Sequence, residues 1–242
     1  MTENNQKSQE ELFLSEYTYP VSFLPQHIHL TSYHFNLSNY KESLYQTLNI
    51  HCPQSIQKSV IKRQAEYLAG RYATSMVFQP LHMPISNVLI GSNRSPIWPQ
   101  GMVASISHSS TIALCAAALD NNYQYLGIDI ERRLSLELVT EIKKSIINNN
   151  EEDLLLSFNN FMSFTDAFTL VFSAKESLFK ALHPQVNSYF DFSAAELLKL
   201  CNKTKQFELV LLQDLSLKLK AGTKFTGNFY FDETHVTTLI AQ

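Results

Sequence analysis

The sequence predicts an α+β fold in which both halves of the chain contain helices and strands. Apolar residues recur at helical spacing over residues 55–78, and a second, mainly helical region extends from about residue 136 to 182. Strand-like segments occur in the middle of the chain and again over its last part. Because helical and strand patterns intermix along the chain, neither an all-helical nor an all-β fold fits.

The elements of the first half begin with an early strand within residues 23–35. The helix expected over 55–78 carries Val60, Leu68, Tyr72 and Met76 at roughly helical spacing, with basic residues on another face. A loop-rich passage with four prolines follows; they are Pro80, Pro84, Pro96 and Pro99.

The middle and the end of the chain are rich in strand patterns. Two short strands are expected at 103–110 and 111–119, and a third at 126–131 after a polar turn. The helical region over 136–182 contains one polar break, NNNEED, at 148–153. The last part alternates as further strands, expected at 207–212, 215–220, 226–231 and 235–240.

Composition limits the class of protein. The chain has 242 residues, of which 45% are hydrophobic and 12% aromatic, so it can bury a core and does not have the composition of a disordered protein. Its formal net charge of -3 argues against a nucleic-acid binder, which would show a strong basic excess. Any binding of phosphate groups must therefore occur at a local site.

The three cysteines and the N-terminus bear on location. Cys52, Cys115 and Cys201 are far apart and odd in number, which fits neither a disulfide framework nor a CxxC metal site. The polar start of the chain is not expected to be a signal peptide, and no transmembrane segment is expected. The sequence thus predicts a cytoplasmic protein.

A pair of carboxylates lies in LGIDIERR, where Asp129 and Glu131 are separated by one residue. On a strand these two side chains share a face, and Ile128 and Ile130 face the core on the other side. Two neighbouring carboxylates repel each other unless Arg132 and Arg133, or a divalent cation, offset their charge. An exposed strand end with ordinary salt bridges is the alternative interpretation.

A third carboxylate lies in FSAKESLFKAL, residues 172–182, where Glu176 and Lys180 share one face of the expected helix. A surface ion pair of this kind contributes only about 0.3 to 0.5 kcal/mol, so stability is a weak reason for it. If Glu176 joins Asp129 and Glu131, three oxygen ligands suit Mg²⁺, and the adjacent lysines can contact phosphates. This combination indicates phosphoryl chemistry.

His108 follows a strand and is flanked by Ser107 and Ser109, which favours a role in presenting donors to an anion; a structural histidine is the alternative. The other histidines lack the spacing of zinc ligands. The sequence also lacks GxxxxGK[ST], GxGxxG and GxSxG, the usual markers of P-loop hydrolysis, dinucleotide redox chemistry and serine hydrolysis.

The order of these motifs resembles that of the 4′-phosphopantetheinyl transferases, in their larger single-chain type and in particular the enterobactin-synthetase component D group. The resemblance rests on five ordered segments and covers the chain from about Lys62 to its end. The segments are RQAEYLAGR, RSPIWPQ, SISHS, GIDIE and FSAKESLFKA, and the ending HVTTLI also fits. Phe172 stands where many relatives have tryptophan, and Ile130 supplies no extra metal ligand.

The resemblance implies transfer of the phosphopantetheine arm of coenzyme A to a serine of an apo carrier protein, with release of 3′,5′-ADP. It implies that Mg²⁺ is held by Asp129, Glu131 and Glu176. Glu176, or a metal-bound water, would help to deprotonate the serine. Lys180 would stabilise or protonate the leaving phosphate, with Lys175 assisting.

The resemblance also implies contacts to coenzyme A. Ser107 and His108 would contact its phosphates, as would Lys175 and Lys180. Arg63 and Arg71 are candidates for the nucleotide's 3′-phosphate, and Arg94 is a weaker one; alternatively, Arg71 pairs with Glu66. Trp98 is assigned to packing. The motif residues thus supply both a base for the nucleophile and positive charge for the diphosphate.

The fold implied by the resemblance has two similar halves, related by a pseudo-twofold axis, with the active site in the cleft between them. We divide the chain into residues 1–122 and 123–242, and expect a monomer. The expected partner is a carrier domain of a peptide, polyketide or fatty-acid synthase. The rival hypotheses are another Mg²⁺-dependent phosphotransferase or nuclease, and a non-catalytic module that binds coenzyme A or a carrier protein.

Overall fold

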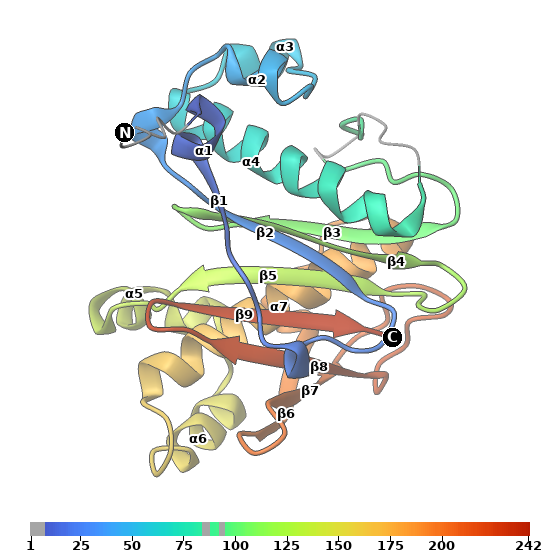
Figure 1. The fold of residues 1–242 in the computed structure, drawn as a ribbon. Coiled ribbons are helices and arrows are strands. Elements are labelled where there is room, and N and C mark those ends of the chain that lie inside the picture. The colour runs from blue at the N-terminus through green and yellow to red at the C-terminus, as the bar shows by residue number, and fades with distance from the viewer. Residues whose placement is uncertain (1–7, 84–87, 92–94) are drawn as a thin grey trace.

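The computed structural model describes residues 8–83, 88–91 and 95–242, which form two sheets with helices on their outer sides (Figure 1). The first sheet has the strand order β1-β2-β4-β3, and the second has the order β5-β9-β8-β7-β6. The strands are β1 (Leu14–Glu16), β2 (His29–Phe35), β3 (Met102–His108), β4 (Ile112–Leu119), β5 (Leu126–Arg132), β6 (Ala195–Cys201), β7 (Gln206–Leu211), β8 (Lys224–Phe231) and β9 (His235–Ala241). The helices are α1 (Gln9–Phe13), α2 (Leu44–Thr47), α3 (Gln54–Gln57), α4 (Ile61–Phe78), α5 (Leu136–Ile146), α6 (Asn149–Ser157) and α7 (Phe164–Val186).

Strand β4 shows how the layers stack. Its residues Ala113, Cys115 and Ala117 belong to the core under α4. The alternate residues of β4 belong to a different core, which they share with Ile128 and Ile130 of β5. Buried on both faces, β4 is therefore an almost continuous apolar segment. The first sheet lies between α4 and the second sheet.

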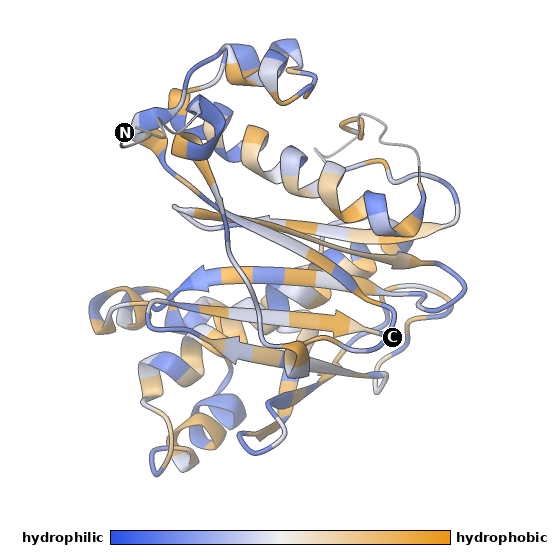
Figure 2. Cartoon of the chain, in the orientation of Figure 1, coloured by the Kyte–Doolittle hydropathy of each residue, from blue (hydrophilic) through white to orange (hydrophobic). Residues whose placement is uncertain are grey.

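The second sheet is covered on its outer side by α7, the longest helix. Ser163 caps the start of this helix by accepting a hydrogen bond from the backbone N–H of Asp166 at 3.1 Å. Buried residues of α7, including Phe168 and Leu178, pack against phenylalanines of β7 and β8. The order of layers is thus helix, sheet, sheet, helix, and Figure 2 shows hydrophobic and polar residues alternating along β5.

Most of the expected strands are confirmed. Strands β2 and β4 fall within the segments expected for them, and β3, β5, β7, β8 and β9 overlap theirs but start or end one or two residues outside them. The i, i+2 argument for β5 also holds, since Ile128 and Ile130 are fully buried. The predicted mixture of helices and strands in both halves is therefore correct.

Three local predictions are wrong. The helix expected over 55–78 is two helices, α3 and α4, separated by residues 58–60. The break expected at 148–153 is shorter and earlier: the chain leaves the helix only at residues 147–148, and the rest of NNNEED is the start of α6, because Asn148 and Glu151 form a reciprocal capping box. The strand expected at 215–220 is a turn, in which the backbone N–H of Leu215 bonds to the carbonyl of Leu219 at 2.8 Å. The strand β6 was not predicted.

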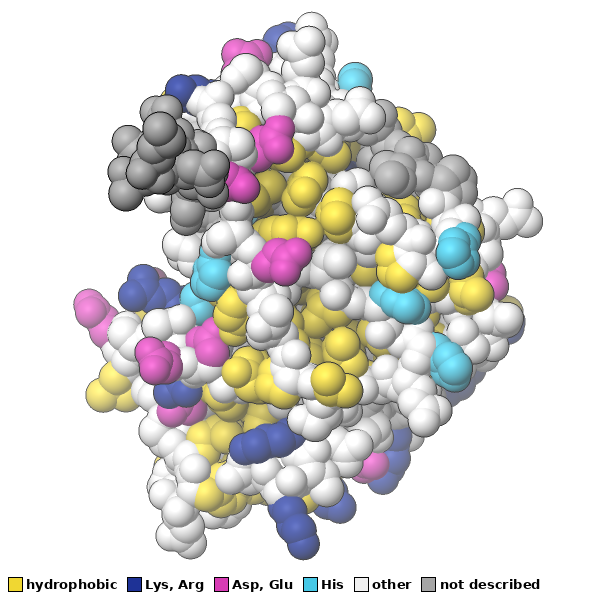
Figure 3. Space-filling view, viewed as in Figure 1, with side chains coloured by type: hydrophobic (Ala, Val, Ile, Leu, Met, Phe, Trp, Pro, Cys, Tyr) yellow, Lys and Arg dark blue, Asp and Glu magenta, His cyan; other side chains and the backbone are white. Residues whose placement is uncertain are grey.

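Within the described residues, no helix combines the length and the apolar character needed to cross a lipid bilayer. On the face of the molecule in Figure 3, acidic and basic side chains are interspersed, and no continuous basic band crosses it.

Candidate active site

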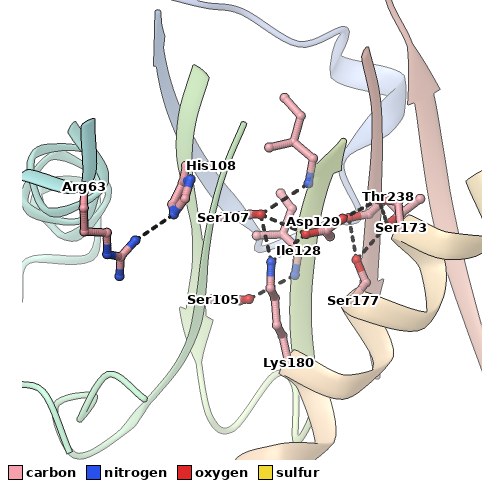
Figure 4. Close-up of polar contacts among 11 residues, drawn as sticks. Arg63, Ser105, Ser107, His108, Ile128, Asp129, Ser173, Ser177, Lys180 and Thr238 are labelled. Carbon is pink, nitrogen blue, oxygen red and sulfur yellow. Dashed lines mark hydrogen bonds and ion pairs between the residues drawn. The ribbon is translucent and has the colours of Figure 1, made fainter. Parts of the chain in front are cut away.

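The two sheets meet where the edge strand β3 lies beside the edge strand β5. Two serine side chains make the junction: Ser105 Oγ accepts a hydrogen bond from the backbone N–H of Ile128 at 3.1 Å, and Ser107 Oγ accepts one from that of Ile130 at 3.4 Å. Side-chain hydroxyls thus satisfy edge N–H groups that would otherwise be buried without a partner. The junction places Ser107 beside Asp129 (Figure 4).

Asp129 is the centre of the polar cluster at this junction and is only 2% exposed. Its Oδ1 accepts hydrogen bonds from Lys180 Nζ at 2.6 Å and from Ser107 Oγ at 2.9 Å. Its Oδ2 accepts one from Ser173 Oγ at 2.8 Å. Lys180 Nζ also donates to Ser107 Oγ at 2.8 Å. The first sheet, the second sheet and α7 each contribute to this cluster.

Close contact between α7 and β5 brings Lys180 and Ser173 to Asp129. A Cβ atom at Gly127 would lie 1.9 Å from the carbonyl oxygen of Ser177 and 2.7 Å from the backbone nitrogen of Ala181, so only glycine fits. Residues 173, 177 and 180 lie on one face of the helix because their spacing follows its period. That face lies against β5 and β9.

The ionised forms of the other two carboxylates of the cluster, Glu131 and Glu176, are destabilised by their surroundings. Burial raises the pKa of Glu131 to about 8, and the charges of Asp129 and Glu176 add to this effect, while Lys180 partly offsets it. The pKa of Glu176 is also raised, by burial first and by Asp129 second, with Lys180 again opposing. The single ammonium group of Lys180 therefore does not balance three neighbouring carboxylates.

This imbalance fits a divalent cation. Three carboxylates are hard oxygen ligands of the kind that Mg²⁺ prefers, and a cation would supply the missing positive charge. Among the described residues, no three His, Cys, Asp or Glu side chains already stand in an arrangement that could hold a metal ion. Asp129 gives three of its approximately four acceptor positions to Lys180, Ser107 and Ser173. The chemistry of the donor set fits Mg²⁺.

A basic region flanks the cluster on the side of α4. His108, on the face of β3 opposite to Ser107, has its Nε2 3.0 Å from Arg63 Nη1. Burial lowers the pKa of His108, and Arg63 lowers it further against the opposing effect of Glu66. The neutral ring can therefore accept a hydrogen bond from Arg63. Glu66 Oε2 lies 3.8 Å from Arg63 Nη1, so the guanidinium group is only loosely paired.

Arg71 lies two helical turns further along α4 and is 9% exposed. Its guanidinium group stacks on Tyr67, with 5.0 Å from Cζ to the ring centroid. Its Nη1 is buried and has no hydrogen-bond partner among the described residues. The ion pairs of Glu66 are instead with Lys62, Arg63 and His108. A buried, unpaired donor of a permanently charged group is costly unless an anion binds it.

Two adjacent hollows connect the basic region with the acidic cluster. One, of about 400 Å³, is lined by Arg63, Arg71 and His108. The other, of about 610 Å³, is lined by Lys180 and by aromatic residues that include Trp98 and Phe179. Both are also lined by Pro96 and Ile106, so they are neighbours. An extended anionic ligand could span them, with one phosphate group near Arg71 and another near Lys180.

The chain matches two family models in succession. Residues 52–118 match the 4′-phosphopantetheinyl transferase N-terminal domain, and residues 125–238 match the 4′-phosphopantetheinyl transferase superfamily. Enterobactin synthase component D of Salmonella typhimurium is 31% identical over 223 residues, which are 92% of this chain and 89% of that protein. The chain belongs to the 4′-phosphopantetheinyl transferases.

Other relatives agree with this assignment. Enterobactin synthase component D of Escherichia coli (strain K12) is 36% identical over 135 residues, 56% of this chain and 62% of that protein. The 4′-phosphopantetheinyl transferase Npt of Nocardia iowensis is 27% identical over 142 residues, 59% of this chain and 62% of that protein. The predicted family and enzyme class are confirmed. The similarity begins earlier than expected, since the first family model starts at residue 52.

The structure separates Lys175 from the other predicted site residues of this transferase. Its Nζ donates to Glu151 Oε2 at 2.8 Å, to the carbonyl of Ile146 at 2.8 Å and to that of Phe192 at 3.2 Å. These contacts use all three N–H donors and tie α7 to α5 and α6. Residues five apart on a helix point about 140° apart, so Lys175 does not share the face of Lys180.

Two further predictions concern Arg94 and Trp98. Arg94 lies outside the described residues. Trp98 packs on Phe78 with a centroid separation of 6.4 Å, as expected for a packing residue, yet it also lines the larger hollow.

Sequence reasoning missed the hydroxyl groups that surround Asp129. Ser173 and Ser177 share the face of Lys180, so polar residues at helical spacing in an apolar helix were an available signal. Thr238 lies directly opposite Asp129 in the pairing of β5 and β9, and only the strand register reveals this.

Proposed function

We propose that this transferase moves the 4′-phosphopantetheine arm of coenzyme A onto a serine hydroxyl of an apo carrier protein, with Mg²⁺ bound, and releases 3′,5′-ADP. The observation that carries the proposal is the cluster of Asp129, Glu131, Glu176 and Lys180. Lys180 lines one hollow, and the adjacent hollow is lined by Arg63, Arg71 and His108. Asp129, Glu131 and Glu176 would hold Mg²⁺. When bound, the ion supplies positive charge that neutralises the diphosphate.

The protein groups then have separate tasks. Glu176 accepts the proton of the incoming serine as a general base. The serine oxygen forms a bond to the phosphorus that carries pantetheine, and the bond from that phosphorus to the bridging oxygen breaks. The electron pair stays with 3′,5′-ADP, whose developing charge Lys180 stabilises through its ammonium group.

The basic region would hold the nucleotide end of coenzyme A. Arg71 presents an unpaired buried donor, and Arg63 and His108 line the same hollow, which supports binding of the 3′-phosphate there. Ser107 is engaged with Asp129 and Lys180, so we propose that it reaches the diphosphate through Lys180. We assign Lys175 to supporting the helix that carries Glu176. Arg94 remains a weaker candidate contact.

The proposed architecture has two similar halves, residues 1–122 and 123–242, with the active site in the cleft between them. Each half has one long helix on the outer face of its sheet and an edge strand at the junction, which supports a pseudo-twofold relation. One chain supplies every proposed catalytic group, so a monomer suffices. The free state of Cys52, Cys115 and Cys201 fits the reducing cytoplasm, the proposed location.

The proposed carrier is one of a siderophore-type peptide synthetase. The support is that the relatives from Salmonella typhimurium and Escherichia coli are named enterobactin synthase component D. Carriers of polyketide and fatty-acid synthases present the same serine hydroxyl, so they belong in the same test.

The test is intact-mass measurement of a panel of apo carrier domains after incubation with the enzyme, coenzyme A and Mg²⁺, with and without EDTA. We expect a phosphopantetheine-sized mass gain that EDTA abolishes. Glu176→Ala should abolish the gain, whereas Glu137→Ala, an exposed carboxylate on α5, should leave it unchanged. Coenzyme A binding without transfer to any carrier would favour the non-catalytic alternative, and absence of coenzyme A binding would contradict the proposal altogether.

A further inference from the structure

A chain of three buried hydroxyl groups ends on Asp129. Ser173, Ser177 and Thr238 are each 0% exposed. Thr238 Oγ1 lies 2.9 Å from Ser173 Oγ and 2.7 Å from Ser177 Oγ. Ser173 Oγ in turn donates to Asp129 Oδ2 at 2.8 Å. Figure 4 shows these groups between α7, β9 and β5.

The contacts fix the direction of the hydrogen bonds. Each hydroxyl group has one proton to donate, and that of Ser173 is directed to the carboxylate. Thr238 must therefore donate to Ser173. The single proton of Ser177 faces the carbonyl oxygen of Thr238 at 3.0 Å, to which it donates, and Thr238 Oγ1 at 2.7 Å. The protons of Thr238 and Ser173 thus point toward Asp129, and the first bond polarises the second.

The last hydroxyl group of this series, that of Ser173, affects how the Asp129 carboxylate is oriented. Oδ1 already accepts from Lys180 and Ser107, and Oδ2 accepts only from Ser173 among the described residues. One acceptor position on Oδ2 is therefore left for a further ligand. A carboxylate rotates readily about its last side-chain bond, and the bond from Ser173 to Oδ2, together with those from Lys180 and Ser107 to Oδ1, holds that position in a fixed direction.

We propose that Ser173 and Thr238 are positioning residues that orient the Asp129 carboxylate for Mg²⁺. Thr238 is the key member because it lies directly opposite Asp129 in the strand register and donates to Ser173. The inference rests on the function proposed above and deepens it by naming the hydroxyl chain that prepares one metal ligand. Residues that orient a metal ligand typically change metal affinity or activity by about 10- to 100-fold when removed.

The competing explanation is that the hydroxyl of Thr238 has only a structural role. The neighbouring residue Thr237 provides a control that distinguishes the two explanations. Thr237 is 1% exposed on the same strand, points to the opposite face and has its Oγ1 2.9 Å from the hydroxyl of Tyr19. Thr237→Val and Thr238→Val thus remove one buried hydroxyl each, with the same change of shape. Only the second change lies in the hydroxyl chain to Asp129.

The experiment compares wild type with Thr238→Val, Thr238→Ser, Ser173→Ala and Thr237→Val. Calorimetric titration with Mg²⁺ in the presence of coenzyme A gives the metal affinity, intact mass of the carrier gives kcat and KM, and calorimetric unfolding gives the melting temperature. We expect Thr238→Val and Ser173→Ala to weaken Mg²⁺ binding and lower kcat by about 10- to 100-fold, with little change in KM for coenzyme A. Thr238→Ser, which keeps the hydroxyl, should restore both.

Two results would overturn the inference. Wild-type Mg²⁺ affinity and kcat in Thr238→Val would show that the hydroxyl chain does not position Asp129. Equal losses in Thr237→Val and Thr238→Val would show that buried hydroxyls matter only for packing. If the wild-type enzyme itself neither bound Mg²⁺ with coenzyme A nor transferred the arm, the proposed function would fail and this inference with it.

Discussion

Replacing Glu131 by glutamine should stabilise the metal-free enzyme at high pH and impair catalysis at the same time. In the folded protein the pKa of Glu131 is raised to about 8 from an ordinary value of 4.5, mainly by burial. The folded state therefore holds a proton that the unfolded chain releases. The stabilising effect of this proton is complete below about pH 4.5 and is lost as the pH rises through 8. Glutamine is neutral at every pH and avoids this loss.

The size of the effect follows from the two pKa values. At about 1.4 kcal/mol for each pH unit, the difference between 4.5 and about 8 corresponds to an upper bound of about 5 kcal/mol for ionising Glu131 in the folded state. Glu131 is only partly buried, and solvent and Lys180 reduce the cost of its charge. We therefore expect a gain of about 1 to 3 kcal/mol for Glu131→Gln at pH 8.5. This corresponds to a melting temperature higher by about 2 to 12 °C.

Calorimetric unfolding in EDTA at pH 5 and pH 8.5 measures this effect, and Glu137→Gln on the exposed surface of α5 serves as the control. The gain should be large at pH 8.5 and small at pH 5, where the folded wild type keeps its proton. Transfer of phosphopantetheine by Glu131→Gln should fall strongly if Glu131 is a metal ligand, as proposed above. An equal gain at both pH values, or no gain at pH 8.5, would refute the reasoning.

Two other substitutions test residues of the basic region and the helix core. Arg71→Met should raise KM for coenzyme A by about 10- to 100-fold with little change in kcat, because a charged hydrogen bond contributes about 1.5 to 3 kcal/mol. It should not destabilise the free enzyme, because the buried Nη1 of Arg71 has no hydrogen-bond partner in the part of the chain that the structure describes. An unchanged KM, as expected for the exposed control Lys58→Met, would show that Arg71 does not contact coenzyme A. Lys175→Met should lower the free energy of unfolding by about 3 to 5 kcal/mol, because it leaves Glu151, whose side chain is 1% exposed, without its partner. Adding Glu151→Gln should recover part of the stability and of the transfer activity. If the double variant is fully folded but does not transfer the arm, Lys175 takes part in catalysis.

The helical period explains both the success and the failure of the sequence argument around FSAKESLFKAL. Glu176 and Lys180 were expected to share a face, and both take part in the carboxylate cluster. Lys175 was grouped with them because it is adjacent in sequence. Adjacent residues on a helix point about 100° apart, however, and the structure directs Lys175 toward Glu151.

The sequence by itself determined the features that depend on local geometry. Two carboxylates one residue apart on a strand must share a face, and apolar neighbours on the other face must enter the core, as Ile128 and Ile130 do. Likewise, the ordered motifs sufficed for the family and the enzyme class. These statements need only the period of a strand or helix and the order of residues.

Only the tertiary structure decided which partners those side chains meet. It joined β3 to β5 through serine hydroxyls, and placed Thr238 opposite Asp129. It also left Arg71, within the described residues, with an unpaired donor instead of an ion pair with Glu66. Each of these contacts joins residues whose approach depends on strand register or on how a helix packs against a sheet. Neither the strand register nor the packing of a helix against a sheet follows from a local period, because both result from the packing of the whole core.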